Sequence, residues 1–258
     1  MNRNRKKPGM ISQQGGNMDP DNGSGKDVLY VSAPVNALVE GIYRENRTLR
    51  EILLQGNFGL GTFNDLDGEM VLLGGSFYQI TGTGEVRKPD LNVRTPFACV
   101  TFFREMMQEA LPAGASSLLE LEEFIKKVLP SLNMMYALWI DGDFEQVQVR
   151  SVPRQEQFRP LKEVTRNQPV FNAKALTGTL AGFYTPGFMS GINVPGIHLH
   201  FLSQDRRFGG HLLKCRAVRL RIGIQLLKSL KMDLPVSLDY MTADFKRNSG
   251  QDLKQAER

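Results

Sequence analysis

The chain has 258 residues, of which 41% are hydrophobic and 23% are charged. This composition is ordinary for a globular protein with a hydrophobic core, and it excludes a fibrous, collagen-like or wholly disordered chain. The formal net charge is +5, but residues 1–27 and 246–258 each contribute +2, so the body between them carries only +1. The charge therefore gives the body no large basic field.

The ends of the chain and its cysteines bear on the cellular compartment of the protein. Residues 1–26 have almost no apolar content and are predicted to be disordered. They lack the apolar stretch of a signal peptide, and no window reaches the roughly 18–20 apolar residues of a membrane span. Two cysteines, Cys99 and Cys215, are too few for a typical disulfide scaffold and are predicted to be buried free thiols. We therefore expect a cytoplasmic protein.

The first part of the body alternates short apolar runs with turn residues. The elements expected in chain order are a strand at 28–31, a turn and helix at 32–43, a short helix at 49–54, a glycine-punctuated strand at 56–63, a turn at 65–68, and strands at 69–73, 76–80, 86–89 and 99–103. Gly74 and Gly75 lie between two apolar runs, which is typical of a hairpin.

The second part begins with the clearest helix, at 117–128, where apolar residues fall on one face. We expect a second hairpin around Gly142, then more strands. These elements are 133–141 and 144–152 for the hairpin, strands at 177–184, 197–202 and 210–220, and strand or mixed structure at 222–230. The pattern predicts an α+β or mixed-sheet fold with hairpins and a few helices.

Polar residues and prolines accumulate at 155–172 and indicate a boundary there. We expect the chain to divide into a disordered tail, two β-rich portions and a polar C-terminal tail. These parts are 1–26, 27–160, 161–245 and 246–258, and the third carries the histidines described next.

The chain contains three histidines, and all fall between residues 198 and 211. In a strand, residues two apart point to the same face, so His198 and His200 would project together while Leu199 and Phe201 face a core. The turn residues that follow can return the chain and bring His211 beside them. Three converging imidazoles favour a site for Zn²⁺ or another borderline divalent metal over histidines that only satisfy hydrogen bonds.

The histidine pattern leaves the kind of metal site open. Cys215 lies four residues after His211 on the same predicted strand, so a closed structural site of three histidines and this cysteine is one alternative. An open site, in which water or substrate completes the coordination of the three histidines, is favoured because no fourth histidine exists.

Together with these histidines, several stretches resemble the acetolactate decarboxylase family. They are GTFNDLDGE at 61–69, VRSVP at 149–153, GINVPGIHLHFLS at 191–203, DR at 205–206 and GGH at 209–211. They occur in the family's order, and the resemblance covers residues 28 to 240 approximately. The histidine stretch is the longest and most specific match.

The resemblance implies two β-rich portions that share a metal site, and a homodimer. It implies zinc bound by His198, His200 and His211, with an acidic residue at Glu69 and a guanidinium at Arg150 near the metal. Family members also bring a glutamate from the C-terminal tail, for which Glu257 is the candidate because it is the only glutamate after Glu163. Thr62, seven residues before Glu69, is a candidate for substrate contact.

The reaction implied by the resemblance is decarboxylation of 2-acetolactate to acetoin and CO₂ in the acetoin/butanediol pathway. Zinc would stabilise the negative charge that develops as CO₂ leaves, and Arg150 would bind the carboxylate or the developing oxyanion. Glu69, with Glu257, would move protons. Taken alone, Glu69 is better explained as a solvated carboxylate at a strand start, and Arg150 is equally uninformative because it could pair with any surface acid. Their functional roles rest on the resemblance.

Two other function classes rank below the decarboxylase, and we expect neither a nucleic-acid partner nor a membrane partner. A metal-dependent oxygenase would use a redox iron and often a carboxylate ligand, so metal identity separates it from the decarboxylase. A binding module with a structural zinc and basic tails would bind nucleic acid in a salt-dependent manner. Residues 214–221 alternate basic and apolar side chains, but this is also the pattern of a strand with one solvated face.

Overall fold

The structure is a computed structural model that describes residues 27–45, 47–112, 114–156, 160–165, 168–246 and 253. The disorder predicted for residues 1–26 and most of the predicted C-terminal tail lie outside the described residues. The helices are α1 (Val35–Val39), α2 (Leu49–Leu53), η1 (Asn64–Leu66), α3 (Leu118–Val128), α4 (Leu161–Thr165), η2 (Gly187–Met189) and α5 (Leu238–Thr242). The strands are β1 (Val28–Val31), β2 (Arg47–Thr48), β3 (Phe58–Thr62), β4 (Glu69–Leu73), β5 (Ser76–Ile80), β6 (Val86–Arg87), β7 (Arg94–Thr95), β8 (Ala98–Thr101), β9 (Met107–Leu111), β10 (Ser116–Ser117), β11 (Met135–Arg150), β12 (Val170–Thr185), β13 (Gly196–Ser203), β14 (Gly209–Leu227) and β15 (Ser229–Met232).

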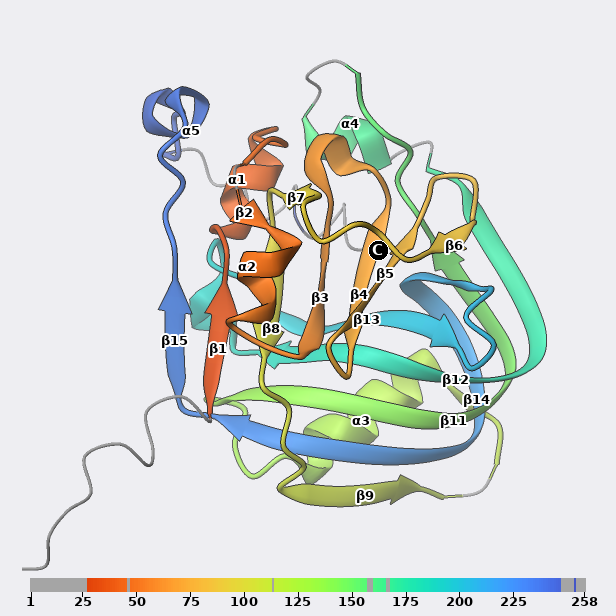
Figure 1. The fold of residues 1–258 in the computed structure, drawn as a ribbon. Helices are drawn as coiled ribbons and strands as arrows, with labels where there is room; N and C mark the ends of the chain where they lie inside the picture. The colour runs from red at the N-terminus through yellow and green to blue at the C-terminus, as the bar shows by residue number, and fades with distance from the viewer. Residues whose placement is uncertain are drawn as a thin grey trace, which may run out of the picture.

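Two sheets make up most of the fold, and their strands run in crossing directions in Figure 1. The first has seven strands in the order β15-β1-β8-β3-β4-β5-β6, with β1 and β15 parallel and the other neighbours antiparallel. The second has six antiparallel strands, in which long β11, β12 and β14 lie beside one another. Strand β13 pairs with both β12 and β14, so the second sheet curls round at this end. The predicted α+β class with mixed and antiparallel sheets is confirmed.

Three hydrophobic clusters fill the space around these sheets. One lies between the sheets and contains side chains of both, such as Phe58 of β3 and Phe183 of β12. A second packs β11–β14 against α3, and the third covers the other face of the first sheet with α2. Each sheet is therefore buried on the face that packs against the other sheet.

Several local predictions are confirmed. The helix expected at 117–128 is α3, which begins after Ser117; this residue and Glu120 form a capping box that satisfies free backbone N–H groups. The hairpin β4–β5 turns at Gly74 and Gly75, whose φ angles of 55° and 81° favour glycine. Leu199 and Phe201 are buried in the cluster against α3, as the alternation in this strand predicts.

The second predicted hairpin is wrong. Gly142 does not turn the chain but lies inside β11, which runs unbroken from 135 to 150 and pairs with β12 on one side and β14 on the other. A side chain at Gly142 would collide with the backbone carbonyl of Arg219 on β14. The glycine therefore allows β11 and β14 to approach closely. A glycine between apolar runs can indicate either a turn or such a close approach, and the sequence alone does not distinguish the two.

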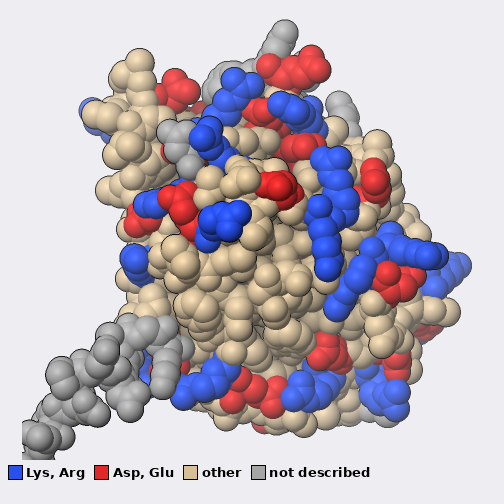
Figure 2. All heavy atoms as spheres, in the orientation of Figure 1, with Lys and Arg blue, Asp and Glu red and all other residues tan. Residues whose placement is uncertain are grey.

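The basic residues of β14 lie on a solvated face, as expected. Arg216, Arg219 and Arg221 are exposed and form ion pairs with carboxylates at 2.9, 2.8 and 2.6 Å. Their partners belong to β11 and to the segment before β9. On the face shown in Figure 2, basic and acidic side chains are likewise mixed around an uncharged centre.

The division of the chain between residues 160 and 161 stays a prediction. Strand β11 comes before that boundary, yet it pairs along its length with β12 and β14, which come after it. Within the described part of the chain, no helix has the length and apolar character required to cross a membrane. Both cysteines are free and buried, as predicted.

Candidate active site

The three histidines lie at the end of the second sheet that faces the first. His198 and His200 project from β13, and His211 lies opposite His200 across the β13–β14 pair. His200 and His211 are buried, while His198 is partly exposed. The hairpin predicted from the sequence therefore brings these three rings together.

The ring nitrogens are close enough to share one ion. One nitrogen from each histidine lies within 4.8 Å of the others, and His198 Nε2 is 3.1 Å from His211 Nδ1. Zinc–nitrogen bonds of about 2.0–2.1 Å in a tetrahedral arrangement place two ligand nitrogens about 3.3 Å apart. Neutral imidazoles at this spacing form a donor set that fits Zn²⁺ or a related borderline metal.

A hydrogen bond fixes the orientation of His200. Its Nδ1 lies 2.8 Å from the carbonyl oxygen of Met70 on β4. Because a carbonyl can only accept, Nδ1 carries the proton and Nε2 is left as the nitrogen able to bind a metal. Burial lowers the pKa of His198 and His200 below the usual 6.5, and the positive charge of Arg150 contributes to both shifts. Both rings are thus held in the neutral form that metal binding requires.

Cys215 does not join this group, so the alternative of a structural site with three histidines and a cysteine is wrong. Leu212 pairs with Val149 and Lys214 with Gln148, which leaves one extra residue in β14 between them. This bulge reverses the alternation of side chains, so Cys215 faces the cluster that packs on α3, away from His211. Burial raises the pKa of its thiol, as expected for a structural cysteine.

Glu69 begins β4, directly opposite Thr62 on β3. It is only 7% exposed, so its interpretation as a solvated carboxylate is wrong. One carboxylate oxygen lies 3.4 Å from His200 Nε2, and the other lies 3.8 Å from a guanidinium nitrogen of Arg150. Thr62 is also buried, and its hydroxyl donates to the carbonyl of Gly68 at 2.7 Å.

The turn before Glu69 is held in a constrained conformation. Asp65 and Leu66 have φ angles of 64° and 53°, which non-glycine residues adopt at a cost. The Asp65 carboxylate accepts from both Arg44 and Arg154, at 2.5 and 2.8 Å, and these contacts stabilise the turn. The turn predicted at 65–68 is thus confirmed, and it sets where β4 and its glutamate begin.

Arg150 ends β11 and is 4% exposed, so it is not the partner of a surface acid. Its Nη1 donates to Gln168 Oε1 at 2.7 Å, whereas the carboxylate of Glu69 is 3.8 Å away. Among the described residues, its buried Nε has no hydrogen-bond partner.

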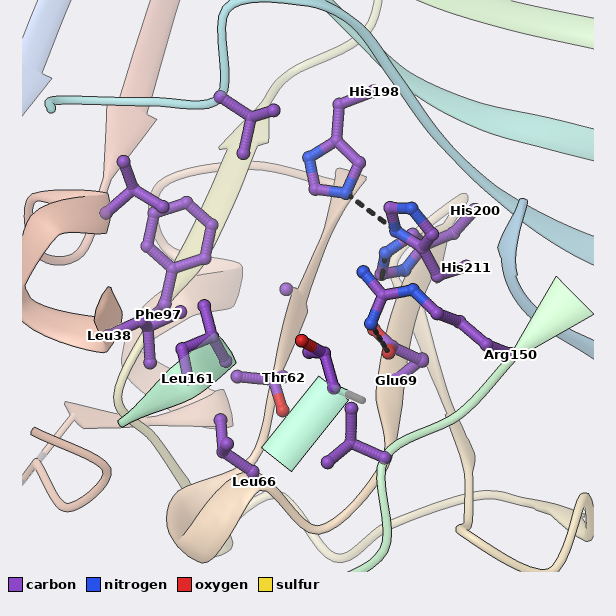
Figure 3. Close-up of a pocket in the computed structure, with 15 residues that line it drawn as sticks. Leu38, Thr62, Leu66, Glu69, Phe97, Arg150, Leu161, His198, His200 and His211 are labelled. Atoms are coloured by element: carbon purple, nitrogen blue, oxygen red, sulfur yellow. Dashed lines mark hydrogen bonds and ion pairs between the residues drawn. The ribbon is translucent and has the colours of Figure 1, made fainter. Parts of the chain in front are cut away.

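All six of the described candidate residues line one pocket, with about 510 Å³ of empty space including its opening. Figure 3 shows its two sides: the histidines, Glu69 and Arg150 on one, and Leu38, Phe97 and Leu161 across from them. The remaining lining residues are Val35, Gly61, Leu66, Val152, Thr165 and Val194. A pocket with apolar walls and a few converging polar groups is suited to a small molecule. Glu257 lies outside the described residues.

The apolar side of the pocket and two residues behind its polar side were not predicted from the sequence. Leu38 and Leu161 come from short helices, α1 and α4, and in the sequence they look like any core leucine. The Met70 carbonyl and the Gln168 amide were identified only from their hydrogen bonds with His200 and Arg150 in the structure. No sequence pattern signals a backbone acceptor, and α4 was not predicted at all.

Comparison with known proteins identifies the family of the chain. The sequence profile of the family described as alpha-acetolactate decarboxylase matches residues 29–247. The chain belongs to this family. A relative named alpha-acetolactate decarboxylase from Methanosarcina mazei is 38% identical over 244 residues, which is 94% of this chain and 84% of the relative. Another of the same name, from Methylococcus capsulatus, is 37% identical and covers 95% of this chain and 94% of its own.

Solved structures of family members have the same fold. Alpha-acetolactate decarboxylase from Bacillus subtilis strain 168 matches with a TM-score of 0.86 at 34% identity, over 89% of this chain and 99% of that one. A Staphylococcus aureus protein described as similar to alpha-acetolactate decarboxylase matches with a TM-score of 0.85 at 27% identity. The family and the enzyme class predicted from the sequence, a carboxy-lyase, are therefore confirmed.

Proposed function

We propose that this protein decarboxylates 2-acetolactate to acetoin and CO₂, as a zinc enzyme of the acetoin/butanediol pathway. The observation that supports this most directly is the meeting of His198, His200 and His211 with a buried carboxylate and a buried guanidinium in one pocket. These groups come from β4, β11, β13 and β14, so the fold assembles them from distant parts of the chain. Family membership supplies the substrate class.

The three histidines would hold the metal, and their donor chemistry fits zinc. When bound, zinc supplies a Lewis acid that stabilises the negative charge developing on the substrate as CO₂ leaves. Leu38, Phe97 and Leu161 line the side across from the histidines with apolar surface, which would reduce the contact of this charge with water.

The remaining polar residues have different proposed roles in substrate binding and proton transfer. Arg150 is permanently charged and would bind the substrate carboxylate through charge-assisted hydrogen bonds. Glu69 would accept and return a proton at the reacting hydroxyl and carbon. The Thr62 hydroxyl already donates to Gly68, so toward a substrate it can act as an acceptor or offer its methyl group.

We keep Glu257 as a second proton carrier. Leu253, four residues before it, is buried in the cluster between the sheets, to which Leu38 and Leu161 of the pocket also belong. The buried position of Leu253 thus ties the chain, four residues before Glu257, to the same cluster as part of the pocket wall. Comparison of Glu257→Gln with the wild type for acetoin formation tests the proposal; equal turnover would remove the role.

The decisive experiment is turnover of racemic 2-acetolactate by the purified protein before chelation, after chelation, and after addition of zinc. We expect acetoin to form, to be lost on chelation and to return with zinc. Absence of acetoin from a zinc-loaded, folded protein would overturn the proposed reaction. Activity restored by Fe²⁺ but not by Zn²⁺ would instead favour the redox-metal alternative.

We also propose a cytoplasmic homodimer. Two buried free cysteines are consistent with a reducing compartment. In the segment that follows the edge strand β15, the side chains of Leu234, Val236 and Leu238 are 59–84% exposed, and Met241 of α5 is 72% exposed. An exposed apolar segment of this kind favours contact with a second copy.

A further inference from the structure

Arg150 is a buried cation whose short contact is to a neutral group. Its Nη1 donates to Gln168 Oε1 at 2.7 Å, while its nearest carboxylate in the described chain, Glu69, is 3.8 Å away. That carboxylate is shared, because its other oxygen faces His200 at 3.4 Å. Buried arginines are usually paired with a carboxylate in direct contact, since an uncompensated charge is costly in a protein interior.

The sheet register places Gln168 at this position. Arg150, the last residue of β11, pairs with Val170, the first residue of β12. The ladder continues for one more hydrogen bond, from the Ser151 N–H to the Pro169 carbonyl, at 3.3 Å. Gln168 therefore lies just beyond the strand end, where its half-buried amide reaches the guanidinium.

We infer that Gln168 is a positioning residue that holds the Arg150 guanidinium against the pocket without cancelling its charge. The amide oxygen fixes Nη1, and the buried Nε has no hydrogen-bond partner within the described part of the chain. The arginine thus keeps both its charge and part of its donor capacity for an anionic substrate. This inference rests on the proposed function, because it assigns the substrate carboxylate to Arg150.

Gln168→Glu separates this role from simple packing. Glutamate has the same shape and keeps an acceptor at the same atom, so a purely structural role predicts nearly normal kinetics. If charge neutrality matters, the new carboxylate forms an ion pair with Arg150 and competes with the substrate. We expect KM for 2-acetolactate to rise about tenfold or more, with kcat changed much less, because uniform binding is lost.

Two further variants complete the design. Gln168→Met keeps the length but removes the acceptor, so KM should rise by a smaller factor of about three to five, as expected for one lost hydrogen bond. Gln148→Glu is the matched control, since Gln148 is a partly exposed residue of the same strand, β11, and its amide contacts Asn172. Its kinetics should equal those of the wild type, and the zinc content of all variants should be unchanged.

A binding measurement distinguishes failure of this inference from failure of the proposed function. Calorimetry with lactate, a small 2-hydroxy carboxylate, should show weaker binding to Gln168→Glu than to wild type, whereas uncharged 2,3-butanediol should bind both equally. Wild-type KM and lactate affinity in Gln168→Glu would overturn the inference while leaving the decarboxylase intact. A wild type that binds lactate in this charge-dependent way but forms no acetoin would overturn the proposed function alone.

Discussion

Glu69 lies between a cation and an imidazole, and this position limits what its carboxylate can do. It is buried, it contacts His200 at 3.4 Å, and it lies 3.8 Å from Arg150. A carboxylate at this distance from a ligand nitrogen and a guanidinium can exchange a proton with a substrate held between them. The same position makes it dispensable for holding the histidine rings, because His200 is fixed by the Met70 carbonyl.

We therefore predict that Glu69→Gln binds zinc normally and loses at least about 100-fold in kcat, the usual contribution of a general acid or base. The amide keeps the size of the side chain but cannot take up the proton. Zinc content by elemental analysis and acetoin formation are the two measurements. Glu123→Gln, an exposed position on α3, is the control and should retain full activity. Normal turnover of Glu69→Gln would remove its catalytic role.

At the residue scale, the sequence indicated which side chains are candidates for function, but not how they are buried or what they contact. The histidine spacing predicted a shared site, and the three nitrogens do lie together. The burial of Glu69 and the partner of Arg150 could not be predicted, because both depend on residues of other strands. The roles of Glu69 and Arg150 stay predictions.

At the scale of elements, close packing between β12 and β13 sets the position of His198. Gly182 pairs with Leu199, and a side chain at this position would collide with the backbone carbonyl of His198. The strand that carries His198 and His200 thus approaches β12 more closely than any larger residue at position 182 permits.

We predict that Gly182→Ala displaces β13, lowers stability by about 1–3 kcal/mol as overpacking does, and weakens zinc binding. Thermal unfolding of the metal-free protein and competition with a zinc chelator measure the two effects. The matched control is Gly187→Ala in η2, because a side chain there meets nothing within 4 Å. Equal zinc affinity in the two variants would show that this contact does not position the ligand.

Glycine also explains the largest error in the predicted elements. Gly74 and Gly75 turn the chain, whereas Gly142 brings β11 close to β14. Both positions follow an apolar run, so the local sequence gives the same signal for two structures. The deciding fact is whether a neighbouring strand occupies the space of the missing side chain, which is a tertiary property.

At the scale of the whole molecule, the site joins the two sheets. His200 of the second sheet donates to Met70 of the first, and Glu69 of the first faces His200 and Arg150 of the second. A ligand bound between them stabilises the folded state over the unfolded chain.

We predict that removal of zinc lowers the melting temperature by several degrees, since saturation at 100 times the dissociation constant contributes about 2.7 kcal/mol. Calorimetric scans with and without chelator measure the shift. A variant with His211→Ala should melt at one temperature in both conditions. If the melting temperature of the wild type is the same with and without chelator, no stabilising metal is bound.

The exposed apolar segment after β15 gives a prediction about assembly. Leu238→Asp in α5 should convert the proposed dimer to a monomer, because a charge in an apolar interface is costly to bury. Light scattering after size-exclusion chromatography gives the mass. Leu119→Asp on α3, where the leucine is 64% exposed, is the control and should leave the mass unchanged. A monomeric wild type would remove the dimer.

The sequence by itself determined the family, the fold class and the group of three histidines. These follow from short-range features: the order of local motifs, the alternation within β13 and the turn that returns β14. Only the tertiary structure decided that Cys215 faces away, that Glu69 is buried, and that Gln168 contacts Arg150. Each of these depends on strand register, where a single extra residue reverses a face, and register is fixed by packing between strands far apart in the chain.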